Sequence, residues 1–251
     1  MHLFKKNFYR FERILNSLGL YDIILKLIDL KIIKNKHYKS DLYKFSTTYT
    51  LIKNFYGYIG HETDYKKGHL GFGLLHHAFI TINKPEKILC IGSQQGFIPA
   101  ICATACRENN YGHVDFVDAG KYKNENNSWG GIGFWKKNNP HKHFAIFNLN
   151  KYITSYIMTS KQFANKYKKR KYEYIYIDGD HSYKGIKYDF KTFWPRLAEN
   201  GIMAFHDIHL KGLSQGKEYG VWKLWQELRQ NNKLSFIIRE NGVGFIQKIT
   251  K

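Results

Sequence analysis

The sequence of 251 residues has few cysteines, few acidic residues and no long uninterrupted apolar run. Its three cysteines, Cys90, Cys102 and Cys106, are too few for a disulfide framework and favour a reducing, cytoplasmic setting. A zinc site is not expected, because Cys102 and Cys106 have no second pair of ligands nearby at the usual spacing. The most apolar early stretch, Leu18–Ile33, is interrupted by charged side chains and cannot span a bilayer unaided.

Acidic residues are half as numerous as basic ones. Twenty Asp and Glu stand against forty Lys and Arg, which gives a formal net charge of +20. Such a charge favours anionic partners, namely nucleic acid, a membrane surface or phosphate-bearing small molecules. The positive charge is spread along the chain, and its densest run, Lys166–Lys171, is typical of a solvated helix end that precedes a strand.

From about residue 70 onward, short apolar runs alternate with stretches of helical periodicity. The pattern predicts strands at 87–91, 114–117, 153–158, 172–177 and 202–205, and helices at 70–82, 98–108, 161–168, 183–197 and 221–229. Segments 235–239 and 243–248 are typical of an antiparallel hairpin around Asn241-Gly242. We therefore expect an α/β fold, a Rossmann-like doubly wound and mostly parallel seven-stranded sheet with a C-terminal antiparallel hairpin.

The first 69 residues are expected to form an N-terminal helical extension, and residues 70–251 the main domain. Apolar residues three or four apart predict a helix over 9–34 that docks on the core. The polar and aromatic stretch that follows favours a loop or lid. We expect residues 35–69, with the Gly/Asn-rich segment Gly120–His143, to cover the sheet's carboxyl edge and to contribute to an acceptor pocket or to a homodimer contact.

Two motifs predict a nucleotide-like ligand at the carboxyl ends of the strands, where open parallel sheets bind ligands. The loop of Gly92, Ser93, Gln94 and Gly96 lies between a strand and a helix, so its backbone can approach a ligand closely. Asp118 ends the next strand, where a carboxylate can accept both hydroxyls of an adenosyl ribose. Capping of the following turn is the alternative role of Asp118, and Asp115 in the same strand is expected to face outward.

Ionisable side chains follow two further strands. Asp178, Asp180 and His181 come directly after one buried strand, and His206 and Asp207 end the next. Because adjacent strand ends lie about 5 Å apart, these groups can face one pocket. Carboxylate-rich sites of this kind suit Mg²⁺, Mn²⁺ or Ca²⁺, and we expect Asp178, Asp180, His206 and Asp207 to be the metal ligands.

The chain resembles class I S-adenosylmethionine-dependent O-methyltransferases over roughly residues 70–248. The segments that carry the resemblance are IGSQQG, VDFVD, IDGDHSYKGIKYDFKTFWPRLAENGIMAFHDI, YGVWKLWQEL and NGVGFIQK. The group that fits is the bacterial small-molecule and sugar methyltransferases, typified by the macrocin and cephalosporin-tailoring enzymes. The resemblance implies that Gly92 and Gly96 approach the methionine part of the cofactor and that Asp118 holds its ribose. One departure is Cys90, which stands where the family usually has an acidic residue.

The resemblance also implies catalytic roles. Asp178, His206 and Asp207 match the metal positions of many relatives, and His181 falls where a general base can stand. A bound Mg²⁺ or Mn²⁺ would position the acceptor hydroxyl and lower its pKa. Without a metal, His181 or His206 would accept the proton.

The acceptor class and two alternative functions stay open at this point. The positive charge favours a nucleotide-linked or phosphorylated sugar of surface-polysaccharide biosynthesis. A nicotinamide-dependent oxidoreductase also uses a glycine loop followed by an acidic strand end, but it normally shows GxGxxG. A nucleic-acid-binding or RNA-modifying protein would suit the charge, yet no helix-turn-helix, zinc or NPPY-type motif supports it.

Overall fold

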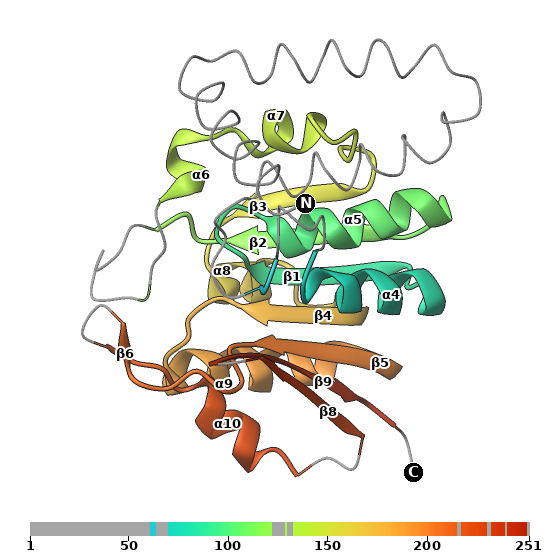
Figure 1. Ribbon diagram of the computed structural model, residues 1–251. Coiled ribbons are helices and arrows are strands. Elements are labelled where there is room, and N and C mark those ends of the chain that lie inside the picture. Colours follow the sequence, from blue (N-terminus) through green and yellow to red (C-terminus); the bar gives the residue numbers. More distant parts are fainter. Residues whose placement is uncertain are drawn as a thin grey trace, which may run out of the picture. The chain divides into compact units, whose positions relative to one another are not determined.

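A seven-stranded sheet forms the centre of the computed structural model, which describes residues 61–63, 70–121, 129, 133–214, 217–229, 232–238 and 240–249 (Figure 1). All of these residues belong to one compact unit, Thr48–Lys251. The strands are β1 (Lys87–Gly92), β2 (His113–Asp118), β3 (Ile153–Ile157), β4 (Tyr172–Asp178), β5 (Leu197–His206), β8 (Lys233–Ile238) and β9 (Asn241–Gln247).

The strand order is β3-β2-β1-β4-β5-β9-β8. Strands β1 to β5 pair with one another in parallel, whereas β9 runs antiparallel to both β5 and β8. The expected doubly wound sheet with a C-terminal antiparallel hairpin is therefore confirmed. A separate two-stranded ribbon joins β6 (Leu213–Ser214) to β7 (Lys217–Glu218).

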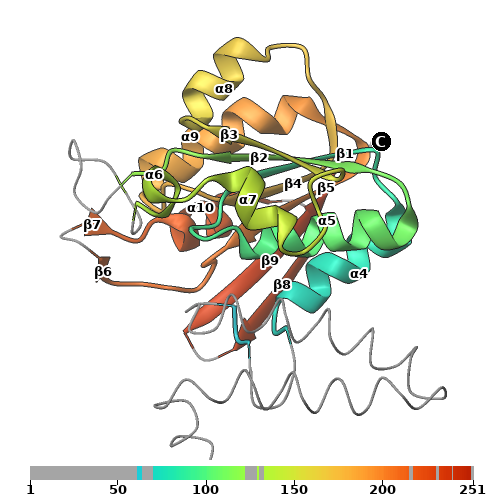
Figure 2. The same ribbon diagram turned by 90° about the horizontal axis from the view of Figure 1, so that it is seen from above.

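Helices cover both faces of the sheet, as Figure 2 shows. One face carries α4 (Gly73–Asn83), α5 (Phe97–Asn109), α6 (Phe134–Lys137) and α7 (Pro140–Ala145), and the other carries α8 (Ser160–Lys166), α9 (Tyr183–Phe193) and α10 (Val221–Glu227). In the described part of the chain, none of these helices has the length and apolar character that a membrane crossing requires.

Alternation along the central strands produces two separate apolar layers. In β1, Ile88 and Cys90 belong to the layer under α4 and α5, whereas Leu89 and Ile91 belong to the layer under α8 and α9. Because successive side chains of a strand point to opposite faces, a strand buried on both sides is apolar at nearly every position. This explains why the central strands read as continuous apolar runs.

The element boundaries differ from those expected from the sequence at a few places. Helix α9 ends at Phe193 and not at Leu197, because Pro195 lies in a short 3₁₀ turn, Trp194–Arg196, and cannot donate the hydrogen bond that would continue the helix. Strand β5 then begins at Leu197, five residues before the expected start. The expected helix over 9–34 lies outside the described residues.

The turn expected at Asn241-Gly242 is wrong. Asn241 pairs with Ile238 and Gly242 with Ile237, so both residues are already in β9. Gly242 has a different role, since a Cβ at this position would come within 2.8 Å of Ile208 Cγ1. Close packing and not turn geometry accounts for this glycine.

Asp115 does not face outward as expected. It is buried, and its Oδ2 accepts hydrogen bonds from Arg170 Nη1 at 2.7 Å and from the Tyr172 hydroxyl at 2.9 Å. The basic run Lys166–Lys171 does connect the end of α8 to the start of β4, as expected for a helix end before a strand. Arg170 is therefore part of a partly buried ion pair within an otherwise exposed basic segment.

Substitution of Phe163 tests the packing of the apolar layer under α8 and α9. The Phe163 side chain is completely buried on α8. Replacing it with alanine removes buried area and leaves a cavity, so Phe163→Ala should lower the free energy of unfolding by about 3–5 kcal/mol. Ile82→Ala on α4 is the matched control: Ile82 is 76% exposed, and the change should stay within about 0.5 kcal/mol. Urea denaturation measures both. Equal losses would show that α8 does not pack as described.

Candidate active site

The carboxyl ends of β1, β2, β4 and β5 lie at one edge of the sheet, at the point where the strand order reverses between β1 and β4. Ligands of open parallel sheets bind at this kind of crevice. Gly92 at the end of β1 is in register with Asp178 at the end of β4. The glycine loop and the polar strand ends predicted from the sequence are therefore direct neighbours.

The loop between β1 and α5 turns sharply through residues with positive φ. Gly92 has φ +76° and Gly96 has φ +86°, and a Cβ at Gly92 would lie 2.0 Å from the carbonyl oxygen of Asp178. Ser93 and Gln94 also have positive φ, at 108° and 47°. Non-glycine residues hold such conformations only where the surroundings impose them, and they cluster at functional sites.

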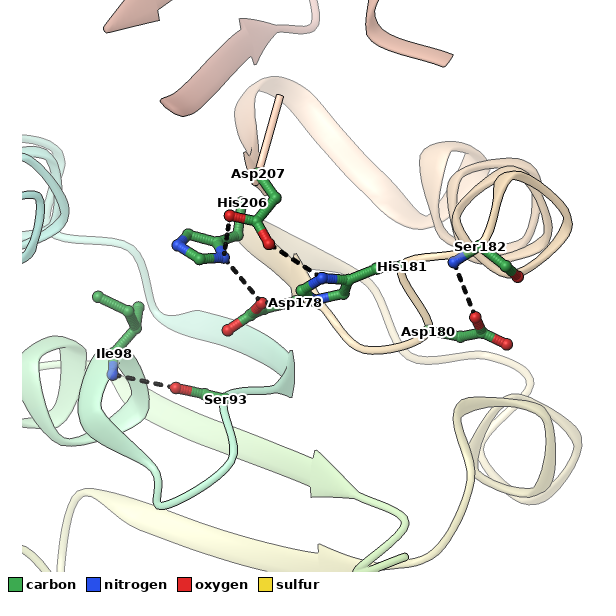
Figure 3. A network of polar contacts seen from close by, with 8 residues as sticks. All are labelled: Ser93, Ile98, Asp178, Asp180, His181, Ser182, His206 and Asp207. Atoms are coloured by element: carbon green, nitrogen blue, oxygen red, sulfur yellow. Dashed lines mark hydrogen bonds and ion pairs between the residues drawn. The ribbon is translucent and has the colours of Figure 1, made fainter. Parts of the chain in front are cut away.

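Ser93 fixes the loop to the helix that follows. Its side-chain oxygen accepts a hydrogen bond from Ile98 N at 3.3 Å (Figure 3), and its carbonyl accepts one from Gly96 N at 2.6 Å. Gly96 packs under the aromatic ring of Phe144, where a Cβ would meet the ring at 2.8 Å. The loop is thus a preformed turn at the edge of the sheet.

Cys90 takes the position that is usually acidic in the family that the sequence resembles. It is completely buried together with Cys102 and Cys106, and all three are free cysteines. Burial raises the pKa of the Cys90 thiol well above its usual value, and Cys102 beside it acts in the same direction. The residue is therefore a neutral apolar contact in the core and supplies no charge to the glycine loop.

Asp118 lies at the end of β2, one strand away from the glycine loop. Its Oδ1 accepts a hydrogen bond from Gly120 N at 2.7 Å, which is the turn-capping role considered above. Among the described residues, no other hydrogen bond to this carboxylate is found. Burial raises the pKa of Asp118 to about 7, outweighing the hydrogen bond from Gly120, and the nearby charge of Asp178 adds to the rise.

Asp178, His181, His206 and Asp207 form one compact polar cluster at the ends of β4 and β5 (Figure 3). His181 Nε2 lies 3.0 Å from Asp178 Oδ1, and its Nδ1 lies 3.0 Å from Asp207 Oδ2. His206 Nδ1 lies 3.1 Å from Asp178 Oδ1 and 3.3 Å from Asp207 Oδ1. Each carboxylate therefore contacts both imidazole rings.

The charges of the cluster stabilise one another. Burial alone would lower the pKa of His181 and His206, but the two carboxylates outweigh it and raise the pKa of His206 to about 9 and that of His181 well above its usual value. Burial would raise the pKa of Asp178 and Asp207, but the histidines hold both below their usual value. Two carboxylates thus balance two imidazoles.

Asp180 is not brought into this cluster. Its Oδ1 accepts a hydrogen bond from Ser182 N at 2.9 Å, and its side chain packs against Gly185 at the start of α9 (Figure 3). Ser182 in turn caps α9 through a hydrogen bond from Gly185 N. Among the metal positions expected from the sequence, Asp180 therefore serves the helix start instead.

The donor atoms that converge differ from the expected ligands Asp178, Asp180, His206 and Asp207, because His181 takes part and Asp180 does not. Among the described residues, Asp178, His181 and His206 each offer one ligand atom, and these atoms all lie within 4.8 Å of one another. Two imidazole nitrogens and a carboxylate oxygen fit Mn²⁺ and other first-row transition ions better than Mg²⁺, which prefers oxygen ligands. The residues present are compatible with a divalent metal ion.

Three residues at the site were not singled out in the sequence, although His61 and Trp129 lie in segments that were expected to cover the sheet edge. His61 is completely buried, and its ring centroid lies 4.4 Å from that of His206. Trp129 stacks on His181 with ring centroids 5.2 Å apart, and Tyr219 packs edge-on against Trp129 at 5.0 Å. Each comes from a segment far from the polar strand ends in sequence, so only the fold brings them together.

His61 lies within residues 35–69, the segment expected to cover the carboxyl edge of the sheet. Burial lowers the pKa of its imidazole well below the usual value, and the neighbouring His206 acts in the same direction. His61 is thus a neutral ring packed against the charged cluster. Its position supports a contribution of this segment to the site.

Comparisons with known proteins agree with this geometry. Residues 89–208 match the profile of a family described as "Methyltransferase domain". An uncharacterized protein of Sinorhizobium fredii, y4gI, is 29% identical over 72 residues, which is 29% of this chain but only 8% of that protein.

Solved structures of low sequence identity share the fold. They include the O-methyltransferase TomG from Streptomyces achromogenes in complex with S-adenosylmethionine (10% identity, TM-score 0.53, 81% of this chain and 89% of that chain). An O-methyltransferase from Bacillus cereus in complex with S-adenosylhomocysteine is similar (13% identity, TM-score 0.53, 81% and 91%). Residues 89–208 thus match a methyltransferase domain profile, and the chain shares the fold of O-methyltransferases solved with S-adenosylmethionine or S-adenosylhomocysteine.

Asp118 tests the cofactor site through its pH dependence. A carboxylate accepts ribose hydroxyls better than a carboxylic acid does, and the pKa of Asp118 is about 7. The affinity for S-adenosylmethionine should therefore rise by up to about 10-fold between pH 6 and pH 8, as Asp118 ionises. Asp118→Asn cannot ionise, so the part of the pH-dependent rise in affinity that comes from Asp118 should be absent in this variant. Its binding free energy for S-adenosylmethionine at pH 8 should be weaker by about 1.5–3 kcal/mol. Calorimetry measures both effects. If the folded variant showed the same affinity at every pH as the native protein, Asp118 would not contact the cofactor.

Proposed function

We propose that this chain binds S-adenosylmethionine and transfers its methyl group to a hydroxyl oxygen of a small anionic acceptor, a nucleotide-linked or phosphorylated sugar. The observation that carries the proposal is the register between Gly92 and Asp178, which sets the glycine loop directly beside the cluster of Asp178, His181, His206 and Asp207. An acceptor oxygen held at this cluster would lie next to a cofactor held at the loop.

Methyl transfer is an in-line displacement at the sulfonium-bound carbon. The bond between sulfur and the methyl carbon breaks as the acceptor oxygen forms its bond to that carbon, and the acceptor hydroxyl loses its proton. The protein must hold the oxygen in line and make it more nucleophilic, and orientation alone can supply a large part of the rate enhancement. The polar cluster is positioned for both tasks.

The geometry favours the metal route over a histidine base at His181. Both ring nitrogens of His181 face carboxylates at 3.0 Å, so neither is directed to an acceptor hydroxyl. Asp178, His181 and His206 would hold a divalent cation, with Asp207 orienting the His181 ring through its other nitrogen. When bound, such a cation lowers the pKa of a coordinated hydroxyl. His181 would then be a ligand, and the proton of the acceptor hydroxyl would pass to solvent.

The acceptor side of the site is aromatic. Trp129 lies over His181 and is flanked by Tyr219, so two rings border the polar cluster. Aromatic faces suit the apolar face of a sugar ring or a nucleobase, while the polar cluster can receive hydroxyl groups. Together with the +20 charge of the chain, this supports a nucleotide-linked or phosphorylated sugar as acceptor.

Asp178 and Asp180 form a matched pair for testing the metal. Removing the cluster carboxylate in Asp178→Asn should weaken Mn²⁺ binding at least about 10-fold, whereas Asp180→Asn should change it by less than about 3-fold because Asp180 only caps the start of α9. Calorimetry with Mn²⁺ measures both, and chelation followed by Mn²⁺ addition tests methyl transfer. Full activity in verified metal-free protein would refute the metal route.

Substitution of Trp129 tests whether its ring contacts the acceptor. Losing one stacking ring should raise the acceptor KM of Trp129→Ala about 10-fold. The affinity for S-adenosylmethionine should not change, because the glycine loop and Asp118 are untouched. Trp129→Phe keeps an aromatic face and should recover most of the loss. If KM stayed the same while kcat fell, Trp129 would orient His181 and not bind the acceptor.

A further inference from the structure

A broad open groove of about 1400 Å³ lies at the amino ends of the central strands. Its walls come from the starts of β1, β2 and β4, from β3, and from the segment that joins α8 to β4. The strands that separate it from Asp178 and the glycine loop are six or seven residues long, so the two sites are roughly 20 Å apart. The groove is therefore distinct from the methyl-transfer site.

The lining of this groove is strongly basic. It contains six Lys or Arg residues and two carboxylates. Both carboxylates are paired, since Glu86 lies 3.4 Å from Lys87 Nζ and Asp115 lies 2.7 Å from Arg170 Nη1. The remaining four basic residues are exposed and make no ion pair within the described part of the chain: Lys166, Lys168, Lys169 and Lys171.

Arg170 is held in place at the centre of this basic segment. Its Nη1 donates to Asp115 Oδ2 and to the Tyr156 hydroxyl at 2.9 Å, and its guanidinium carbon lies 3.9 Å from the ring centroid of Tyr167. Asp115 is itself fixed by the Tyr172 hydroxyl. The other N–H groups of Arg170 make no hydrogen bond to a described residue, and the side chain is 37% exposed.

This arrangement matches the requirements of phosphate recognition. A planar guanidinium whose orientation is fixed on one edge can offer its other N–H groups as a fork to phosphate oxygens. The four unpaired lysines repel one another, and a polyanion would relieve that repulsion. The groove is broad and open, so it leaves room for a ligand with several phosphates.

We propose that this groove binds the phosphate groups of a nucleoside phosphate ligand, with Arg170 as the oriented contact and the four lysines as the surrounding charge. The ligand is either a free nucleotide or a short single strand of nucleic acid, which share this chemistry. The basic run expected from the sequence to be only a solvated helix end thus forms a binding surface. The inference does not depend on the acceptor proposed for the methyltransferase site.

The test compares two triple variants of the full-length protein with the same change in net charge. Lys168→Gln, Lys169→Gln and Lys171→Gln together remove three groove charges. Lys142→Gln, Lys184→Gln and Lys191→Gln remove three exposed charges on α7 and α9, outside the groove. Anisotropy with a labelled single-stranded RNA of about eight nucleotides, and competition by pyrophosphate and ATP, measure binding.

The groove variant should bind the RNA about 10-fold or more weakly than the native chain, with a smaller dependence on salt, and the control variant should bind within about 2-fold. Arg170→Lys keeps the charge but removes the fork, so its affinity should also fall. Displacement by ATP at similar affinity would identify a free nucleotide, and displacement only by RNA would identify a strand. Equal losses in both triple variants, or no binding of any probe by the native chain, would overturn the proposal. Binding of S-adenosylmethionine should be unchanged in both triple variants, which separates this test from that of methyl transfer.

Discussion

The close approach of β1 and β4 at their carboxyl ends is the constraint on which the site depends. Gly92 has no room for a side chain, because a Cβ there would collide with the backbone carbonyl of Asp178. This contact sets the turn that begins the glycine loop and places it beside the first carboxylate of the polar cluster. A larger residue would have to separate the two strands, and both halves of the site would move apart together.

The polar cluster illustrates how a fold can bury four ionisable groups. Taking Asp178, Asp207 and two imidazoles out of water is costly, and the loss of hydration is offset only because each carboxylate contacts both rings. An arrangement of this kind is not required for packing, since apolar residues would fill the same space with less loss of hydration. The cluster is therefore best explained as a functional site whose side chains the sheet positions. The strained φ of 58° at Asp207 is consistent with this explanation.

Much of this arrangement could be predicted from the sequence, and the limits have physical causes. Parallel strands end at a common edge, so the proximity of Gly92, Asp178 and His206 follows once the strands are recognised. Asp180 could not be separated from Asp178, because only the start of α9 decides which carboxylate turns toward the helix. His61 and Trp129 were missed because they reach the site through long-range packing. The Asn241-Gly242 pair is a common turn signal, but the strand register of β9 overrode it.

Strand β4 connects the two sites, and this limits the insertions and deletions that the sequence can tolerate. It begins at Tyr172, which holds Asp115 in the basic groove, and it ends at Asp178 in the polar cluster. Between them, Tyr174 and Tyr176 fill one apolar layer while Ile175 and Ile177 fill the other. Inserting or deleting a single residue would exchange these faces and turn tyrosines into the wrong layer. Homologous sequences can therefore vary in length in the loops at either end, but β4 itself must keep a constant length.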